Sequence, residues 1–193
     1  MSNIDTNDVL RYLGCSEGLD DARVLAHIAQ LHEELNTVIT PKHIYRLWDC
    51  EVQAQAVGFG GLRVHSGDLA RHLRGCTRVA VFAATLGAEA DALLRRYNAT
   101  EMDKAVIADA VCTAMIEAAC DSVVGEITRE PELLGWQLTE RFSAGYGDFD
   151  ITHQRDVLTM LDCPRRIGLT LTDGNMLCPA KSVTAVVGLR RIV

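Results

Sequence analysis

Apolar residues recur at the three-to-four-residue spacing of a helix in five parts of the chain. The first part, Leu19–Leu35, places apolar side chains on one face, and Asp20 or Asp21 can cap its start. The longest, Met102–Ile127, is apolar on most sides and rich in alanine, which indicates a helix packed in the centre of the fold. The pattern predicts three shorter helices at 66–73, 88–97 and 152–161, with Ser66 and Thr152 as N-caps.

Short apolar runs bounded by turn residues predict the strands. Val79–Ala83 contains β-branched and aromatic side chains, as expected of a buried strand. Ile44–Ala56 fits either a strand or a short helix, and Gly58–Gly61 predicts a turn. Further strands are expected at 62–65, 138–143, 167–171 and 182–189. Because helices and strands are mixed without a regular βαβ period, the sequence predicts an α+β fold.

Length and composition favour a globular chain. It has 193 residues, a length that is enough to bury a core. Of these residues, 48% are apolar and only four are proline. Thr40-Pro41 interrupts the helical pattern, because proline cannot donate a backbone hydrogen bond. We therefore expect an N-terminal helical segment at 1–40 and a core at 41–193, together one compact domain. The net charge of −7 argues against a nucleic acid bound through its phosphates.

The sequence also predicts a cytoplasmic protein without a membrane segment. The longest stretch without a charged side chain, Val52–Leu62, has 11 residues, whereas a membrane-spanning helix needs about 20. The N-terminus is polar and acidic, unlike a signal peptide. The seven cysteines are odd in number and include no Cys-x-x-Cys. This pattern predicts free thiols and no metal site.

The segment Arg141–Asp148 is the richest in candidate binding groups. Gly145 and Gly147 flank Tyr146, and residues without a Cβ let a ligand approach the backbone closely. The planar guanidinium of Arg141 suits a carboxylate. Taken alone, the same segment also fits an ordinary turn that happens to contain an arginine.

Two carboxylates stand out on the long predicted helix. Glu117 and Asp121 lie four residues apart, on one face of the long predicted helix. Glu117 could meet a ligand ammonium group or simply pair with Arg141, and the residues leave both possibilities open. Glu140 is expected on the opposite face of its strand from Arg141. The dinucleotide-binding, nucleophile-elbow and His-Glu-x-x-His motifs are all absent.

Three segments together carry a family resemblance: Arg141–Asp148, Arg166–Thr172 and Pro179–Ala185. They resemble the activation domain of cobalamin-dependent methionine synthase, and the stretches 9–14, 82–87 and 115–121 are similar to it as well. The chain has no Asp-x-His-x-x-Gly, the element that carries cobalamin in its own binding domain. The resemblance therefore implies a stand-alone reactivating protein whose cobalamin is carried by a separate protein.

The family implies both a fold and a reaction. The expected fold is a twisted, mainly antiparallel sheet with flanking helices around the long central helix. Such a domain binds S-adenosylmethionine in a shallow groove and caps the cobalamin of its partner. An electron from a flavodoxin- or ferredoxin-type reductant and the methyl group of S-adenosylmethionine then return oxidised cob(II)alamin to methylcobalamin. The expected partner is a cobalamin-dependent methionine synthase or a related corrinoid protein.

The resemblance also implies roles for individual residues. Arg141 would meet the carboxylate of S-adenosylmethionine, and Glu117 its amino group. No catalytic residue and no metal ligand are implied, so the chain would be an accessory component of a methyltransferase. The full set implied to bind S-adenosylmethionine is Glu117, Arg141, Ser143, Ala144, Gly145, Tyr146 and Gly147, and the residues implied to face the cobalamin or the partner are Asp148, Lys181 and Ser182.

The chain departs from the family pattern at two places. Ala144 stands where family members usually have a proline, and 185–188 contains no aromatic residue where longer members have a tyrosine. These departures leave two alternatives open. The chain could be a docking module for a corrinoid protein that does not bind S-adenosylmethionine, or it could bind a different small molecule in the same groove.

Overall fold

The structure, a computed structural model, describes residues 4–15 and 22–192. Its main sheet has the strand order β3-β2-β1-β4-β8-β5, and every neighbouring pair is antiparallel. A small separate ribbon pairs β6 with β7. The strands are β1 (Lys42–Val52), β2 (Val57–Phe59), β3 (Leu62–Val64), β4 (Arg78–Thr85), β5 (Trp136–Phe142), β6 (Thr170–Leu171), β7 (Leu177–Cys178) and β8 (Ser182–Arg191).

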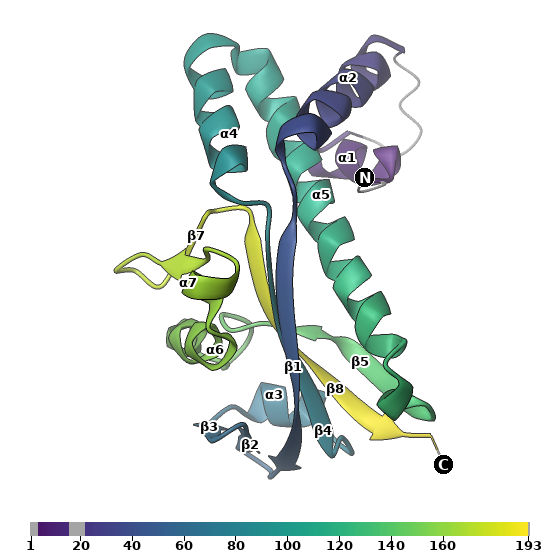
Figure 1. Cartoon of the computed structure of the whole chain (residues 1–193), viewed down its shortest axis with the longest axis vertical. Helices are drawn as coiled ribbons and strands as arrows, with labels where there is room; N and C mark the ends of the chain where they lie inside the picture. Colours follow the sequence, from purple (N-terminus) through teal and green to yellow (C-terminus); the bar gives the residue numbers. More distant parts are fainter. Residues whose placement is uncertain (1–3, 16–21, 193) are drawn as a thin grey trace.

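Helices cover both faces of the sheet (Figure 1). One face carries α5 together with the N-terminal helices α1 and α2, and the other carries α3, α6 and α7. Helix α4 packs against α5 beyond the end of the sheet. The helices are α1 (Thr6–Tyr12), α2 (Ala22–Val38), α3 (Gly67–His72), α4 (Ala88–Thr100), α5 (Met102–Thr128), α6 (Gln154–Leu161) and α7 (Cys163–Arg166), with 3₁₀ turns at Pro131–Leu133 and Ile151–His153.

The central strand β4 shows why its sequence is continuously apolar. Phe82 and its neighbours two residues away point into the core under α5, whereas Val79 and Val81 point into the core under α3 and α6. A strand covered on both faces has no solvent side, so polar residues do not alternate along it. Helix α5 is likewise apolar on most sides because it contacts the sheet, the helices α1 and α2 of its layer, and α4.

The predicted α+β class, with a mainly antiparallel sheet and a long helix over 102–128, is confirmed. Most of the ambiguous segment Ile44–Ala56 belongs to strand β1, which begins two residues earlier, at Lys42, and ends at Val52, before the end of that segment. The predicted turn is narrower than expected, because β2 includes Gly58 and Phe59. Gly60 and Gly61, at φ +57° and +84°, make the two-residue hairpin. Side chains of α1 and α2 join the core under α5, while the division at residue 40 stays a prediction.

Three local predictions differ from the structure. The strand expected at 167–171 is reduced to Thr170–Leu171, because α7 ends there and Gly168 turns the chain at φ +71°. Asp150, not Thr152, caps the turn that leads into α6 by accepting a hydrogen bond from the Thr152 N–H. Helix α1 lies within the helical segment expected at 1–40, but its own bounds were not predicted. The expected cap at Asp20 or Asp21 lies outside the described residues.

No helix in the described part of the chain is both long enough and apolar enough to cross a membrane.

Candidate functional site

The centre of the candidate site is an ion pair between the sheet and the long helix. Arg141 on β5 reaches Glu117 on α5, with 2.7 Å between Nη2 and Oε2. Asp121, one turn further along α5, lies 3.6 Å from the same nitrogen. Burial alone would lower the pKa of Arg141, but the hydrogen bond with Glu117 and the nearby carboxylates raise it, so the guanidinium stays charged. The sequence left the role of Glu117 open, and in this structure it pairs with Arg141.

A buried thiol completes the surroundings of the guanidinium. Cys120 on α5 is fully buried and interacts with Arg141. Burial raises the pKa of Cys120 to about 12, so it remains a neutral thiol. Arg141 is therefore held by two carboxylates and a neutral sulfur, which leaves the cluster with a net negative charge. Such a cluster attracts a positively charged group.

The loop after β5 closes on itself through its own backbone. The N–H of Gly145 donates to the Phe149 carbonyl at 2.7 Å, and the N–H of Tyr146 donates to the Ser143 carbonyl at 3.1 Å. Gly145 and Gly147 adopt φ +100° and +53°, a region that disfavours side chains. A Cβ on Gly147 would also overlap the carboxylate of Asp68 on α3. The two glycines that the sequence singled out are therefore required by the shape of this loop.

Four of the predicted ligand residues line one pocket of about 210 Å³: Glu117, Arg141, Ser143 and Tyr146. Tyr146 is 58% exposed, so its ring is available to a ligand. The other predicted residues lie differently. The side chain of Ala144 is buried in the core beside Phe149, and Gly147 lines a neighbouring hollow with His72 and Phe142.

Sequence reasoning missed two residues of this pocket, Val183 and Glu140. Val183 lies on β8, and no local signal connects it with Arg141. Glu140 was expected on the opposite face from Arg141, yet both residues line the pocket. The register between β5 and β8 shifts between Leu138 and Arg141, which marks a bulge. A bulge redirects the residues that follow it, and simple alternation does not foresee that change.

Asp148 anchors the loop to the start of helix α3. Its carboxylate accepts hydrogen bonds from the Ser66 hydroxyl and from the N–H groups of Gly67 and Asp68 at 2.8 and 3.1 Å. Asp68 in turn accepts a hydrogen bond from the Asp148 N–H at 3.2 Å. The Ser66 and Asp68 hydrogen bonds lower the pKa of Asp148. The sequence foresaw Ser66 as an N-cap but not its bond to Asp148.

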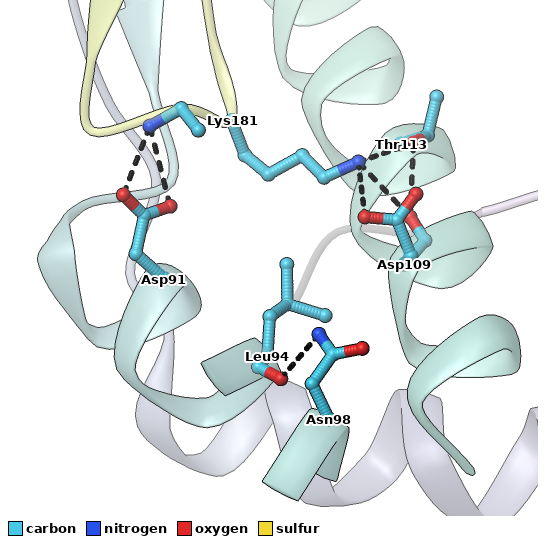
Figure 2. A network of polar contacts seen from close by, with 7 residues as sticks. Asp91, Leu94, Asn98, Asp109, Thr113 and Lys181 are labelled. Carbon is cyan, nitrogen blue, oxygen red and sulfur yellow. Dashed lines mark hydrogen bonds and ion pairs between the residues drawn. The ribbon is translucent and has the colours of Figure 1, made fainter. Parts of the chain in front are cut away.

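Lys181 and Ser182, predicted to face the cobalamin or the partner, make bonds within the chain. Figure 2 shows the ammonium group of Lys181 between Asp109, at 3.0 Å, and the Thr113 hydroxyl, at 2.8 Å. The neighbouring Ala180 N–H donates to the carboxylate of Asp91 on α4. The Ser182 hydroxyl bonds to Thr85 and to the Pro179 carbonyl. These bonds hold the start of β8 against α4 and α5.

Comparison with known proteins decides the family. The sequence model described as "Vitamin B12 dependent methionine synthase, activation domain" matches residues 69–190, more than half of the chain. The chain belongs to this family. The match includes Glu117, the loop after β5 and most of β8, and it confirms the resemblance seen in the motifs.

A solved structure supports the assignment of the fold. The chain is similar to the "Crystal Structure of the MetH Reactivation Domain bound to AdoHcy", with a TM-score of 0.71 and 17% sequence identity. The alignment covers 92% of this chain and 68% of that chain. At this identity the likeness shows that the two chains share a fold. The curated proteins that were compared show no match to this sequence.

Residues 185–188 of the last strand leave no room for an aromatic side chain in the present packing. Ala185, Val186 and Val187 are buried between the two helical layers. A Cβ on Gly188 would lie 2.6 Å from the Cys76 sulfur and 2.6 Å from Leu73. The missing tyrosine is therefore part of how this core is packed. No cluster of three or more metal-ligating side chains occurs among the described residues.

Proposed function

We propose that this activation domain binds S-adenosylmethionine with its amino-acid end in the pocket between Glu117 and Arg141. Both ion pairs of Arg141 leave from Nη2, and a guanidinium has five N–H donors, so Arg141 can bind a ligand carboxylate in addition. The ammonium group of the ligand would meet Glu117. The net negative charge of the cluster suits a ligand that also carries a positive sulfonium.

The size of the pocket fits part of the ligand. Its volume of about 210 Å³ is below the range of about 300–1,000 Å³ that encloses a whole drug-sized ligand. We infer that the adenosine extends along the loop 143–147, where glycines leave backbone groups accessible and Tyr146 offers a flat face. The neighbouring hollow at Gly147 and Phe142, about 390 Å³, provides the additional space.

The reaction that we propose is the reactivation of cobalamin on a separate cytoplasmic protein. S-adenosylmethionine would supply an electrophilic methyl group and leave as S-adenosylhomocysteine, and the partner's cobalamin would accept the methyl group after receiving one electron from a flavodoxin- or ferredoxin-type reductant. This chain contributes by holding the sulfonium in a fixed position. Fixing the orientation of the reactants in this way raises the rate of methyl transfer. The expected partner is a cobalamin-dependent methionine synthase or a related corrinoid protein. The contact between Arg141 and Glu117, in a fold also seen with AdoHcy bound, is the observation that carries the proposal.

Calorimetric titration of the purified protein tests the proposal. Saturable binding of S-adenosylmethionine in the micromolar range, about −8 kcal/mol, is the expected result. S-adenosylhomocysteine (AdoHcy) lacks the sulfonium charge, so it should bind more weakly to the negatively charged cluster. The absence of binding up to millimolar ligand would contradict the proposal and favour the docking module without a ligand.

A further inference from the structure

A second hollow, separate from the pocket at Arg141, opens at the other end of the loop. It has a volume of about 530 Å³, within the range of small-molecule sites. Its walls are the chain that follows β1 (52–55), the exposed side of α3 and the carboxylate-bearing Asp148. No residue of this hollow lines the Glu117–Arg141 pocket. Any ligand bound here would therefore be a second ligand.

Arg74 and Gln53 leave hydrogen-bond donors available in this hollow, and Arg71 uses only part of its guanidinium group within the chain. Arg71 lies in the last turn of α3 and Arg74 in the turn that follows the helix, and both line the hollow. The guanidinium of Arg74 makes no ion pair with any described residue. Arg63 donates to the Gln53 side-chain oxygen at 2.8 Å, which leaves the NH₂ group of Gln53 free to donate. Two guanidinium groups and an oriented amide thus face the same space.

The acceptors, in contrast, are already engaged. Asp148 accepts hydrogen bonds from the Ser66 hydroxyl and two N–H groups at the start of α3. Asp68 pairs with Arg71 at 2.8 Å and also accepts from the Asp148 N–H. Each carboxylate near the hollow is thus satisfied within the chain, whereas Arg74 is not. The two arginines and these two carboxylates balance in charge, so an anion would bind here through the unpaired guanidinium of Arg74 and not through a net positive charge.

We propose that this hollow binds an organic phosphate, with Arg74 and Arg71 on the phosphate and Gln53 donating beside them. Guanidinium groups match phosphate oxygens in geometry and charge. The volume is larger than a phosphate group alone requires, so the ligand carries a small organic body. The proposal does not depend on the Glu117–Arg141 pocket, which shares no residue with this hollow, although Arg71 also lines the hollow proposed to hold the adenosine.

The test compares ribose 5-phosphate with ribose, which differ only in the phosphate group. Calorimetry on the full chain should show saturable binding of ribose 5-phosphate and no binding of ribose. Arg74→Gln should weaken the affinity at least tenfold, because it removes charge-assisted hydrogen bonds and keeps a polar side chain. Arg165→Gln is the matched control, since Arg165 is 86% exposed on α7 and does not line the hollow. Its affinity should equal that of the original protein.

Three outcomes would overturn the proposal. The first is no binding of ribose 5-phosphate at 10 mM, a concentration about 100 times the dissociation constant of a typical metabolite site. The others are equal binding of ribose and an equal loss of affinity in Arg74→Gln and Arg165→Gln. The last outcome would show a diffuse charge effect without a defined site. The variant Arg141→Ala distinguishes binding at this hollow from binding at the Glu117–Arg141 pocket. This variant should retain ribose 5-phosphate binding whether or not S-adenosylmethionine binds to the original protein.

Discussion

Arg141→Ala removes the guanidinium from the candidate pocket and leaves the carboxylates of Glu117 and Asp121 in place. If Arg141 holds the ligand carboxylate in a bidentate manner, the variant loses two charge-assisted hydrogen bonds. Each contributes about 1.5–3 kcal/mol, so the expected loss is about 3 kcal/mol or more. Because 1.4 kcal/mol corresponds to a tenfold change, the Kd for S-adenosylmethionine should rise about 100-fold or more.

The same change should leave the fold intact. The side chains of Arg141 and Glu117 are 28% and 38% exposed, so solvent screens their ion pair. Partly exposed pairs contribute about 1 kcal/mol or less to the free energy of unfolding, and water can reach Glu117 in the variant. We therefore expect cooperative unfolding with a free energy lowered by about 1 kcal/mol.

Calorimetry gives the Kd, and urea unfolding followed by circular dichroism gives the stability of the same samples. Arg165→Ala, which removes an exposed arginine far from the pocket lining, is the matched control and should bind normally. If Arg141→Ala binds S-adenosylmethionine within threefold of the original protein, the ion pair with Glu117 is structural only. The assignment of Arg141 to the ligand carboxylate would then be wrong.

Three further changes probe the loop and the start of β8. Asp148→Asn should destabilise the fold at neutral pH. The lowered pKa of Asp148 gives stability that is present above the unfolded pKa, near 4, and is lost as pH falls through the folded pKa. In urea unfolding, the free energy of unfolding of the variant should thus be lower than that of the original protein at pH 7, and this difference should shrink below pH 4. A difference that stays constant with pH would contradict this reasoning. Lys181→Met breaks the bonds to Asp109 and Thr113 and should lower the free energy of unfolding by about 1–2 kcal/mol. Urea unfolding measures this change, and an unchanged free energy would show that these bonds contribute little. Ala144→Pro should raise the free energy of unfolding by up to about 1 kcal/mol and leave S-adenosylmethionine binding nearly unchanged in calorimetry, because the Ala144 N–H donates no hydrogen bond to any described residue and Asp148 already fixes the loop. A lower free energy of unfolding would show that φ there does not suit proline.

Sequence reasoning works best where one local pattern decides the structure. The apolar run of Val79–Ala83 and the long helix over Met102–Ile127 are found close to their predicted bounds, because burial on both sides leaves a clear signal. The Arg141–Asp148 loop also carries its own signal, since its glycines adopt positive φ. The segment Ile167–Leu171 was wrongly predicted as a strand because its apolar residues are buried, as in a strand. Most of them lie in the turn that follows the short helix α7.

The remaining features of the site depend on residues distant in the sequence. The bulge in β5 that brings Glu140 to the pocket depends on the register with β8. Lys181 appears in the sequence as an exposed cation after a proline, yet its partners lie on α5, about 70 residues earlier. Neither contact leaves a periodic signal, because each is fixed by tertiary packing.

The hydrogen bonds of Asp148 bear on the departure of Ala144 from the family pattern. A proline before the glycine-tyrosine pair would stiffen this turn by restricting the unfolded chain. Here the loop is fixed from outside: Asp148 binds the first turn of α3, and Asp68 returns a bond to the loop backbone. Gly147 is needed so that Asp68 can approach that closely. Contacts between two segments 80 residues apart thus perform the role that a proline would perform locally, and the pocket at Arg141 is shaped before any ligand arrives.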